Sequence, residues 1–339
     1  PIPLIRCSKC GIVPLEEKDL PLTLPKVKSY EPTGTGESPL KNIKNWVKTK
    51  CPQCGSPAER ETQTMPQWAG SCWYYLGYIL KNLKFKIKNQ KSKRGKYEIV
   101  WDKNKLKYWL PVDFYVGGAE HAVLHLLYAR FWHKFLYDIG WVHNKEPFQR
   151  LFNQGLILGP DGQKMSKSKG NVINPDEVVK EYGADTLRMY EMFLGPLEAE
   201  KPWSVEGIKG IFRFLNRVWL LAQKVKKRKL NKEKANDEEI KYALNNLIYE
   251  TTEGIKKLRF NVVISKLMIF EDLLRQKIEK ENIYDKEAFL TFIKLLFPFA
   301  PHLSQEIWRL LGKKTLLDFE PWPKYDTKLL EKKQFQIVI

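Results

Sequence analysis

The sequence lacks any long apolar stretch and is poor in acidic residues and in cysteine. No apolar run approaches the roughly 20 residues that a membrane-spanning helix needs, and no signal peptide precedes Pro1. We therefore expect a cytoplasmic protein with no membrane partner. Asp and Glu number 39 against 58 Lys and Arg, which gives a net charge of +19. This excess favours a polyanionic partner such as a nucleic acid, although a thermophilic source or an AT-rich genome would also enrich lysine.

The composition is that of a globular protein. The 339 residues are 43% hydrophobic and 13% aromatic, which allows about two to three domains of ordinary size. The chain starts with "PIPLI" and stops at "FQIVI", an apolar run of strand character with no turn after it. Both ends look cut, so we expect an excerpt of a longer polypeptide.

Four of the five cysteines form two C-x-x-C-G motifs. Cys7 and Cys10 make the first pair and Cys51 and Cys54 the second. Four thiolates suit the tetrahedral preference of Zn²⁺ and leave no open position for a substrate, so the pattern predicts a structural zinc site. Disulfides or free thiols are the alternative, which a cytosolic setting disfavours. The intervening chain is rich in Pro, Gly, Thr and Lys, and it predicts a loop-dominated module that depends on the metal.

The stretch "TMPQWAGSCWYYLGYIL", residues 64–80, is crowded with aromatic side chains. Trp73, Tyr74, Tyr75 and Tyr78 are for the most part expected in a core. The small Ser71-Cys72 pair beside them could equally line a pocket for an apolar side chain. Residues 81–109 are strongly cationic, and we expect a solvated hairpin with a Lys-Ser-Lys-Arg-Gly turn, which is either an RNA contact or a soluble insertion.

Residues 111–140 predict the corner of a nucleotide-binding α/β fold. Val112, Phe114 and Val116 alternate like a strand that ends at Gly117-Gly118, and a helix is expected with Glu120 in its first turn. A strand, a glycine turn and a helix N-terminus together face the phosphate and ribose of a bound nucleotide in such folds.

Two histidines follow on the expected helix. His121 and His125 are four residues apart and therefore lie on one face of a helix. The metalloprotease pattern H-E-x-x-H places its glutamate between the histidines, whereas Glu120 precedes both. We therefore favour polar residues that line a ligand pocket over a metal site.

The segment "GPDGQKMSKSKGN", residues 159–171, is a basic, glycine-rich loop. A strand, "RLFNQGLILG", precedes it, and Asn174-Pro175 with Glu177 predicts the capped start of a helix after it. Lys164, Lys167 and Lys169 supply positive charge, and Ser166 and Ser168 supply hydrogen-bond donors. These groups suit the neutralisation of a polyphosphate at the carboxyl edge of a sheet. A plain lysine-rich surface loop is the alternative, and the Walker A pattern is absent.

From about Trp203 the sequence changes to long amphipathic helices. Ile211, Phe214, Leu215, Val218 and Trp219 follow a helical period on one apolar face. Later segments such as "FNVVISKLMIFEDLL" repeat this period, which indicates an all-α bundle.

Several of these motifs together resemble a known family. Residues 164–168 reproduce the KMSKS signature of class I aminoacyl-tRNA synthetases letter for letter. "GGAEHAVLHLLYARF" is similar to leucyl-tRNA synthetases in particular, because the isoleucyl, valyl and methionyl enzymes carry different residues after the corresponding glycine. "SCWYYLGY", "NPDEVVKEYGADTLRMYEMFLGPL" and the two C-x-x-C-G motifs extend the resemblance to a bacterial leucyl enzyme along almost the whole chain.

The resemblance implies an α/β fold, the C-terminal half of a Rossmann-like class I synthetase catalytic domain, with a small zinc-binding module and an all-α helical bundle. The zinc module would comprise residues 1–62 and the catalytic half residues 63–205. The anticodon-binding-type bundle would comprise residues 206–323, and residues 324–339 would link to a C-terminal domain beyond the chain.

The resemblance also implies a reaction. Such an enzyme activates leucine with ATP and Mg²⁺ to leucyl-adenylate and transfers it to the 3′-terminal adenosine of tRNA-Leu. Lys164 and Lys167 would be catalytic. The residues near ATP would be Gly117, Gly118, Glu120, Lys164, Met165, Ser166, Lys167 and Ser168. The leucine and adenylate pocket would hold Cys72, Tyr78, His121 and His125.

Some features depart from the family or fall outside the chain. Gly77 stands where many relatives have arginine, and no leucine-specific module precedes the basic loop. The HIGH half of the catalytic domain and the editing domain would lie before Pro1, as part of the same chain or as a separate subunit, so we expect the chain alone to be inactive. The rivals are a non-catalytic RNA-binding derivative and a related enzyme for isoleucine, valine or methionine.

The basic run after the first long helix has two interpretations. Lys224, Lys226, Lys227, Arg228 and Lys229 either contact the tRNA backbone or form a solvated charge run.

Overall fold

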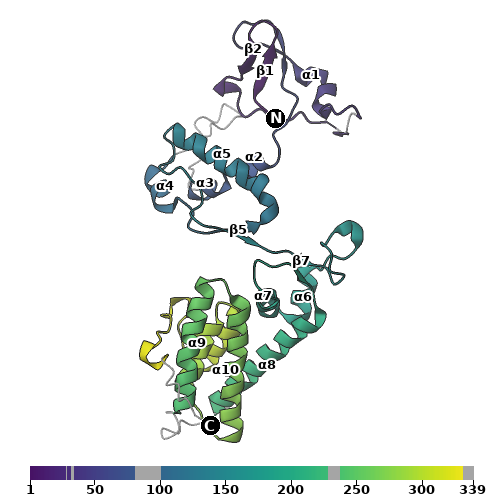
Figure 1. Ribbon diagram of the computed structural model, residues 1–339. Coiled ribbons are helices and arrows are strands. Elements are labelled where there is room, and N and C mark those ends of the chain that lie inside the picture. Colours follow the sequence, from purple (N-terminus) through teal and green to yellow (C-terminus); the bar gives the residue numbers. More distant parts are fainter. Residues whose placement is uncertain (28, 32–33, 81–100, 228–236, 331–339) are drawn as a thin grey trace, which may run out of the picture. The chain divides into compact units, whose positions relative to one another are not determined.

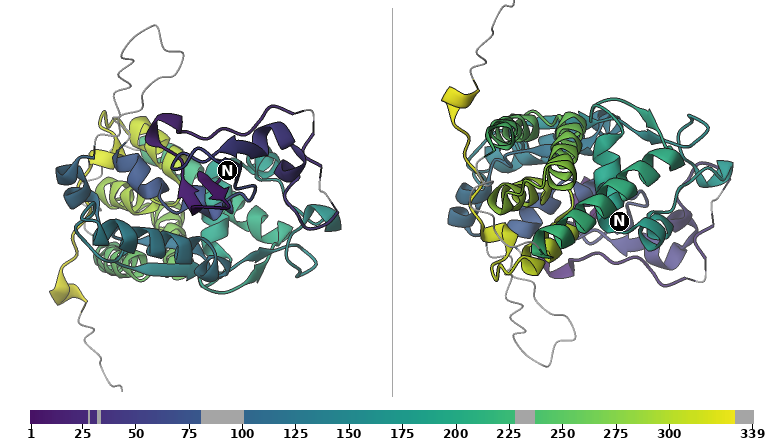
Figure 2. Two further views of the ribbon diagram at one scale, coloured as in Figure 1. Left: turned by 90° about the horizontal axis from the view of Figure 1, so that it is seen from above. Right: turned by 90° about the horizontal axis from the view of Figure 1, so that it is seen from below.

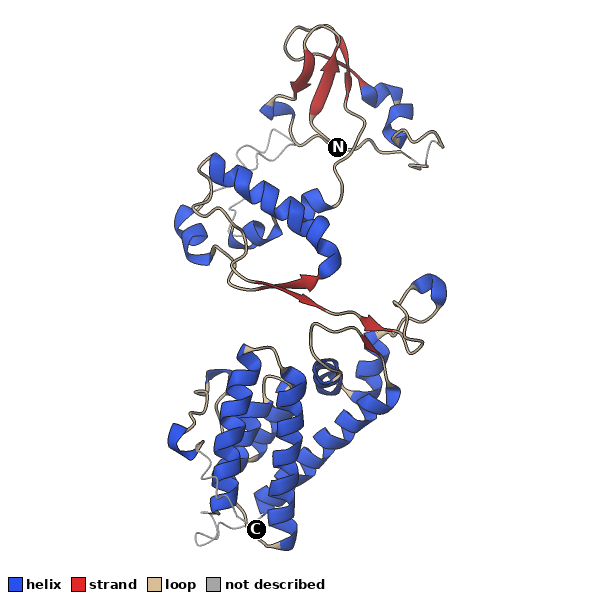
Figure 3. Ribbon diagram, in the orientation of Figure 1, coloured by secondary structure: helices blue, strands red, loops and turns tan. Residues whose placement is uncertain are grey.

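The computed structural model describes residues 1–27, 29–31, 34–80, 101–227 and 237–330 (Figure 1). The chain divides into two compact units, Pro1–Phe152 and Asn153–Ile339. This boundary falls inside residues 63–205, which the sequence predicted as one domain. Short strands occur in both units, whereas long helices dominate the second (Figure 3). None of the helices in the described ranges is both long and apolar enough to cross a bilayer.

The first part of unit 1 is a small antiparallel sheet. Its strands have the order β2-β1-β4-β3 and comprise β1 (Leu4–Cys7), β2 (Gly11–Pro14), β3 (Lys48–Lys50) and β4 (Pro57–Arg60). Between β2 and β3 the described chain forms only the short helices η1 (Glu17–Asp19), η2 (Pro39–Asn42) and α1 (Lys44–Val47). The expected loop-rich character is thus present, on a sheet that the sequence did not predict.

The second part of unit 1 packs short helices around one long helix. The elements are α2 (Trp68–Ser71), α3 (Tyr74–Ile79), α4 (Lys103–Trp109), β5 (Tyr115–Gly118), η3 (Ala119–Val123) and α5 (His125–Asp138). Tyr75, Leu76, Leu106 and Leu136 belong to their common buried core. The hairpin expected within residues 81–109 falls largely outside the described residues, and its last part forms α4.

The aromatic cluster of residues 73–78 is less buried than expected. Tyr75 is buried, but Trp73, Tyr74 and Tyr78 are exposed, so the prediction that most of these rings lie in the core is wrong. Helix α3 turns Tyr75 and Leu76 into the core and Ile79 against it, which leaves Tyr74 and Tyr78 on its other side.

The predicted strand before the basic loop is split in two. β6 (Leu151–Gln154) pairs with β5, and β7 (Ile157–Leu158) pairs in parallel with β8 (Lys201–Pro202). The break lies at Gly155, whose N–H donates to the Leu197 carbonyl over 2.9 Å. A Cβ on Gly155 would overlap the Ala199 carbonyl group, so the backbones of these two segments pack directly against each other.

The rest of unit 2 is helical. Helices α6 (Pro175–Tyr182) and α7 (Ala184–Phe193) precede the bundle, which consists of α8 (Val205–Lys227), α9 (Glu238–Lys256), α10 (Phe260–Lys280), α11 (Lys286–Leu296) and α12 (Pro301–Leu310), followed by η6 (Leu317–Phe319) and η7 (Thr327–Leu329). Helices α9 and α10, green in Figures 1 and 2, lie side by side.

The predicted apolar face of the first bundle helix is confirmed. Ile211, Phe214, Leu215 and Val218 are buried in the core of unit 2, and Trp219 packs against that core while partly exposed. The predicted cap of α6 is also present, because the Asn174 side chain accepts from the Asp176 N–H and Pro175 is the first helical residue.

Candidate functional site

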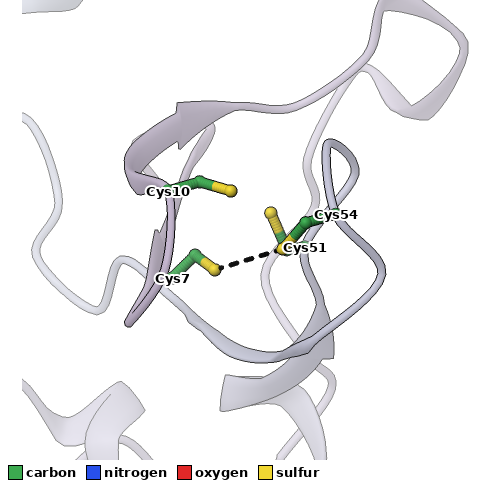
Figure 4. A group of neighbouring side chains, drawn as sticks. All are labelled: Cys7, Cys10, Cys51 and Cys54. Carbon is green, nitrogen blue, oxygen red and sulfur yellow. Dashed lines mark hydrogen bonds between the residues drawn. The ribbon is translucent and has the colours of Figure 1, made fainter.

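The four paired cysteines converge on one point of unit 1 (Figure 4). Their sulfur atoms all lie within 4.8 Å of one another, and the Sγ atoms of Cys7 and Cys54 are 3.6 Å apart. Cys7 and Cys10 flank the turn between β1 and β2, while Cys51 and Cys54 flank the turn between β3 and β4. Gly11 and Gly55, at φ +75° and +71°, allow both turns because other residues rarely adopt these angles.

This geometry fits a tetrahedral zinc ion. Zn–S bonds of about 2.3 Å place tetrahedral sulfurs about 3.8 Å apart, close to the observed separations. Hydrogen bonds from Ser56 lower the pKa of Cys54 to about 6, whereas the hydrogen bond with Cys54, followed by burial, raises the pKa of Cys10 to about 12. Such a crowded set of thiols loses its protons together only when a cation offsets the charge. The four cysteines are therefore consistent with the predicted zinc site.

The glycine corner lies in the same unit. Gly118 ends β5 and is buried, and the exposed Glu120 folds its carboxylate back over it, where a Cβ on Gly118 would meet it. The expected single helix is wrong here. Glu120 and His121 lie in η3, and the backbone turns at Leu124, so that His125 begins α5. His121 and His125 nevertheless remain neighbours, with ring centroids 6.3 Å apart.

His125 belongs to a directed chain of hydrogen bonds. The Tyr74 hydroxyl donates to the Tyr115 hydroxyl over 2.8 Å, and the Tyr115 oxygen lies 2.6 Å from Nε2 of His125. Tyr115 therefore donates to Nε2, which leaves the proton on Nδ1, 3.0 Å from the Ser71 hydroxyl. Burial, followed by the proximity of His121, lowers the pKa of His125, so this ring is neutral at pH 7.

His121 offers an unused polar atom. Its Nδ1 is buried and has no hydrogen-bond partner within the described residues. The ring lies edge-on to Trp68 at 5.5 Å between centroids. A buried nitrogen without a partner is costly unless a ligand or a water molecule satisfies it.

The remaining two predicted pocket residues differ in burial. Cys72 is buried, and its thiol lies 3.2 Å from the Ala69 carbonyl. Tyr78 is 71% exposed on α3, next to Tyr74 at 5.7 Å between centroids. Sequence reasoning did not single out Ser71 and Tyr115 as partners of His125, because nothing in a linear pattern signals such contacts.

The basic loop lies in unit 2, between β7 and α6. Lys164, Lys167 and Ser168 are exposed, whereas Met165 packs against the core of unit 2 and anchors the loop. The Ser166 and Ser168 hydroxyls are 2.6 Å apart. No ion pair holds Lys164 or Lys167 to an acidic residue of the described chain, so both ammonium groups are free to meet an anionic ligand.

The basic side chains at the end of α8 are not all available to bind a partner. Lys224 pairs with Glu279 of α10, which gives it a role within the bundle. Arg228 and Lys229 lie outside the described residues.

Comparison with known proteins places these features in a family. Residues 92–203 match the tRNA synthetases class I (I, L, M and V), and residues 237–339 match the anticodon-binding domain of tRNA ligase. The chain belongs to the class I tRNA synthetases. Its fold accordingly combines a mixed α/β catalytic portion, a four-cysteine cluster and a helical anticodon-binding domain, as the resemblance implied.

A solved structure is similar to this class I synthetase chain over nearly its whole length. It is the crystal structure of the ternary complex of Agrobacterium radiobacter K84 agnB2 LeuRS-tRNA-LeuAMS, which is 34% identical with a TM-score of 0.80. The match covers 98% of this chain and 42% of that one. The chain thus spans less than half the length of this relative.

Proposed function

We propose that the chain is part of a leucine–tRNA ligase. The observation that carries the amino-acid assignment is the likeness to a LeuRS at 34% identity over 98% of the chain. The class I family that matches the chain also includes enzymes for isoleucine, methionine and valine, so leucine is the finer claim. The complete enzyme would use ATP with Mg²⁺ to activate leucine and would transfer it to tRNA-Leu.

The basic loop would act on the phosphates of ATP. When the leucine carboxylate attacks the α-phosphorus, the bond to pyrophosphate breaks and leucyl-adenylate forms. Negative charge accumulates on the departing phosphates, and the unpaired ammonium groups of Lys164 and Lys167 would stabilise it. Ser166 and Ser168 would donate hydrogen bonds, and Met165 would keep the loop attached to unit 2.

The glycine corner would hold the nucleoside and the amino acid. The Glu120 carboxylate beside Gly118 would accept from the ribose hydroxyls, and Gly117 and Gly118 would let the ligand approach the backbone. The unsatisfied Nδ1 of His121 and the neutral ring of His125 would line the leucine and adenylate pocket with Cys72 and Tyr78.

The helical bundle would bind tRNA, as its match to the anticodon-binding domain supports. The zinc ion would cross-link the two turns of the four-cysteine module and take no part in the reaction.

Further polypeptide would complete the active site. Helix α5 leaves a row of apolar side chains exposed, Leu127, Phe131 and Phe135, spaced four residues apart. Such a stripe is normally covered in a folded protein, and the rest of the synthetase is the proposed cover.

The test is amino-acid-dependent ATP–pyrophosphate exchange by the complete polypeptide that carries this chain. Leucine should support exchange far better than isoleucine, valine or methionine. Preference for one of those three would replace the leucine assignment. No exchange with any amino acid, while tRNA still binds, would favour a non-catalytic RNA-binding derivative.

A further inference from the structure

Two side chains, Asp161 and Asn171, hold the two ends of the basic loop together. The proposed reaction gives neither of them a role. Nδ2 of Asn171 lies 3.2 Å from each carboxylate oxygen of Asp161. Oδ1 of the same amide accepts the backbone N–H of Ser166 over 2.9 Å. Nδ2 is also 3.4 Å from the carbonyl oxygen of Lys164. One amide therefore ties the end of the lysine segment to its beginning and to the turn before it.

Asp161 is itself fixed within that turn. Its Oδ1 accepts the Gln163 N–H over 3.1 Å, and the turn is closed by a 2.7 Å bond from the Gly159 N–H to the Gln163 carbonyl. The Gln163 N–H and then the Asn171 amide lower the pKa of Asp161, so this carboxylate is ionised at neutral pH.

The backbone leaves room for this contact at Gly159. A Cβ there would lie 2.6 Å from Oδ1 of Asp161 and 2.9 Å from Nδ2 of Asn171. Both distances are well inside van der Waals contact, so any side chain at this position would displace the pair. Gly159 thus serves close packing.

We propose that Asp161 and Asn171 form a latch that sets where Lys164 and Lys167 stand, with Asn171 as the positioning residue. The latch spans residues 161–171, and both lysines lie between its anchored ends. Its effect on catalysis rests on the proposed function, because it assumes that these lysines act on ATP. A displacement of about 1 Å at a catalytic group can cost about a hundredfold in rate.

Three variants of the intact protein test the latch. Asn171→Ala removes the contacts of this amide with Asp161, the Ser166 N–H and the Lys164 carbonyl. Asn171→Asp brings two carboxylates together. The exchanged pair Asp161→Asn with Asn171→Asp restores one amide donor, one carboxylate and an acceptor for the Ser166 N–H. Asn246→Ala is the matched control, because this half-buried asparagine donates along its own helix, to the Tyr242 carbonyl, and lies outside the basic loop.

The first readout is amide hydrogen exchange at Ser166, which requires no activity. Loss of one hydrogen bond should speed exchange about two- to tenfold in Asn171→Ala. In the double variant Asp161→Asn with Asn171→Asp, the hydrogen-exchange rate at Ser166 should return toward the wild-type value. In the control Asn246→Ala this rate should equal that of wild type. Unaltered Ser166 exchange in Asn171→Ala contradicts the latch, whatever the protein's activity.

The second readout is leucine-dependent ATP–pyrophosphate exchange. We expect kcat to fall roughly tenfold to a hundredfold in Asn171→Ala and Asn171→Asp, with a smaller change in KM for ATP, because the lysines are misplaced rather than removed. The exchanged pair should be clearly faster than Asn171→Asp alone. If the double variant is no faster than Asn171→Asp, the positioning role is wrong. If the wild type shows no leucine-dependent pyrophosphate exchange, the proposed function fails, while hydrogen exchange at the Ser166 amide still tests the latch.

Discussion

At the scale of single residues, polar contacts decide what each candidate group can do. His125 is neutral with its proton on Nδ1, because Tyr115 donates to Nε2 and burial lowers its pKa. His121, four residues earlier, keeps a buried nitrogen without a partner in the described chain. The sequence predicted both histidines as pocket residues. It could not assign these different states, since they depend on Tyr74, Tyr115 and Ser71 from other segments.

A buried carboxylate in the bundle gives a pH-dependent prediction. The Glu271 side chain is fully buried, with Oε2 3.2 Å from Nε of Arg217, while Oε1 has no hydrogen bond in the described chain. Burial raises the pKa of Glu271 despite the attraction of Arg217 and then Arg275. Between the unfolded pKa of about 4.3 and the raised folded value, the native state holds a proton that the unfolded state has lost. Stability from this group therefore falls as pH rises through that window.

Glu271→Gln should remove this dependence. Relative to the variant, wild type should lose free energy of unfolding between pH 5 and pH 8. Denaturant unfolding of both proteins at the two pH values measures the difference. A wild type that loses no stability relative to the variant over this range would show that the two arginines offset burial.

At the scale of elements, sequence patterns predicted best where local chemistry is decisive. The cap at Asn174 and the apolar face of α8 follow from nearest neighbours along the chain, and both are present. The helix expected from Glu120 is instead a 3₁₀ turn followed by α5, and the strand before the loop is split at Gly155. The split arises from the backbone contact of Gly155 with a distant segment at Leu197 and Ala199, which no local period encodes.

The four-cysteine module gives a prediction at this scale. The purified chain should carry about one zinc ion, and Cys10→Ser should lose most of it, because tetrahedral sites need all four ligands. Cys72→Ser is the matched control and should keep the metal, since Cys72 lies outside the cluster. Chelation should also unfold the small sheet, whose buried core includes only Ile5, Val13 and Ala58 besides two of the cysteines. Zinc content by atomic emission checks these outcomes, and equal zinc in both variants would refute the site.

At the scale of the whole molecule, the net charge of +19 fits the proposed tRNA partner. Binding of tRNA to the complete polypeptide should weaken by about a hundredfold between 50 and 200 mM salt if about four phosphates are contacted. Lys227→Ala should reduce the salt slope by about one, whereas Lys224→Ala should change it less, because Lys224 already pairs with Glu279. Titration of labelled tRNA at several salt concentrations measures the slopes. Equal effects of the two variants on the salt slope would contradict this prediction.

The sequence could predict features that lie within one short continuous segment of either unit. The family motifs identified the glycine corner in unit 1 and the basic loop in unit 2, because each is a short continuous segment. The hydrogen bonds made by Asp161, Asn171, Ser71 and Tyr115 carry no such signature, and only the folded structure reveals them. Within each unit, the candidate groups therefore combine motif residues that the sequence reveals with contacts that only folding supplies.

The most direct test of the central claim is the effect of Lys167→Ala on leucine-dependent ATP–pyrophosphate exchange by the complete polypeptide. Lys180→Ala, an exposed lysine of α6 outside the loop, is the control. If the loop stabilises the transition state, Lys167→Ala should lose on the order of a hundredfold or more in kcat, and the control should match wild type. Equal exchange rates for all three proteins would contradict the account.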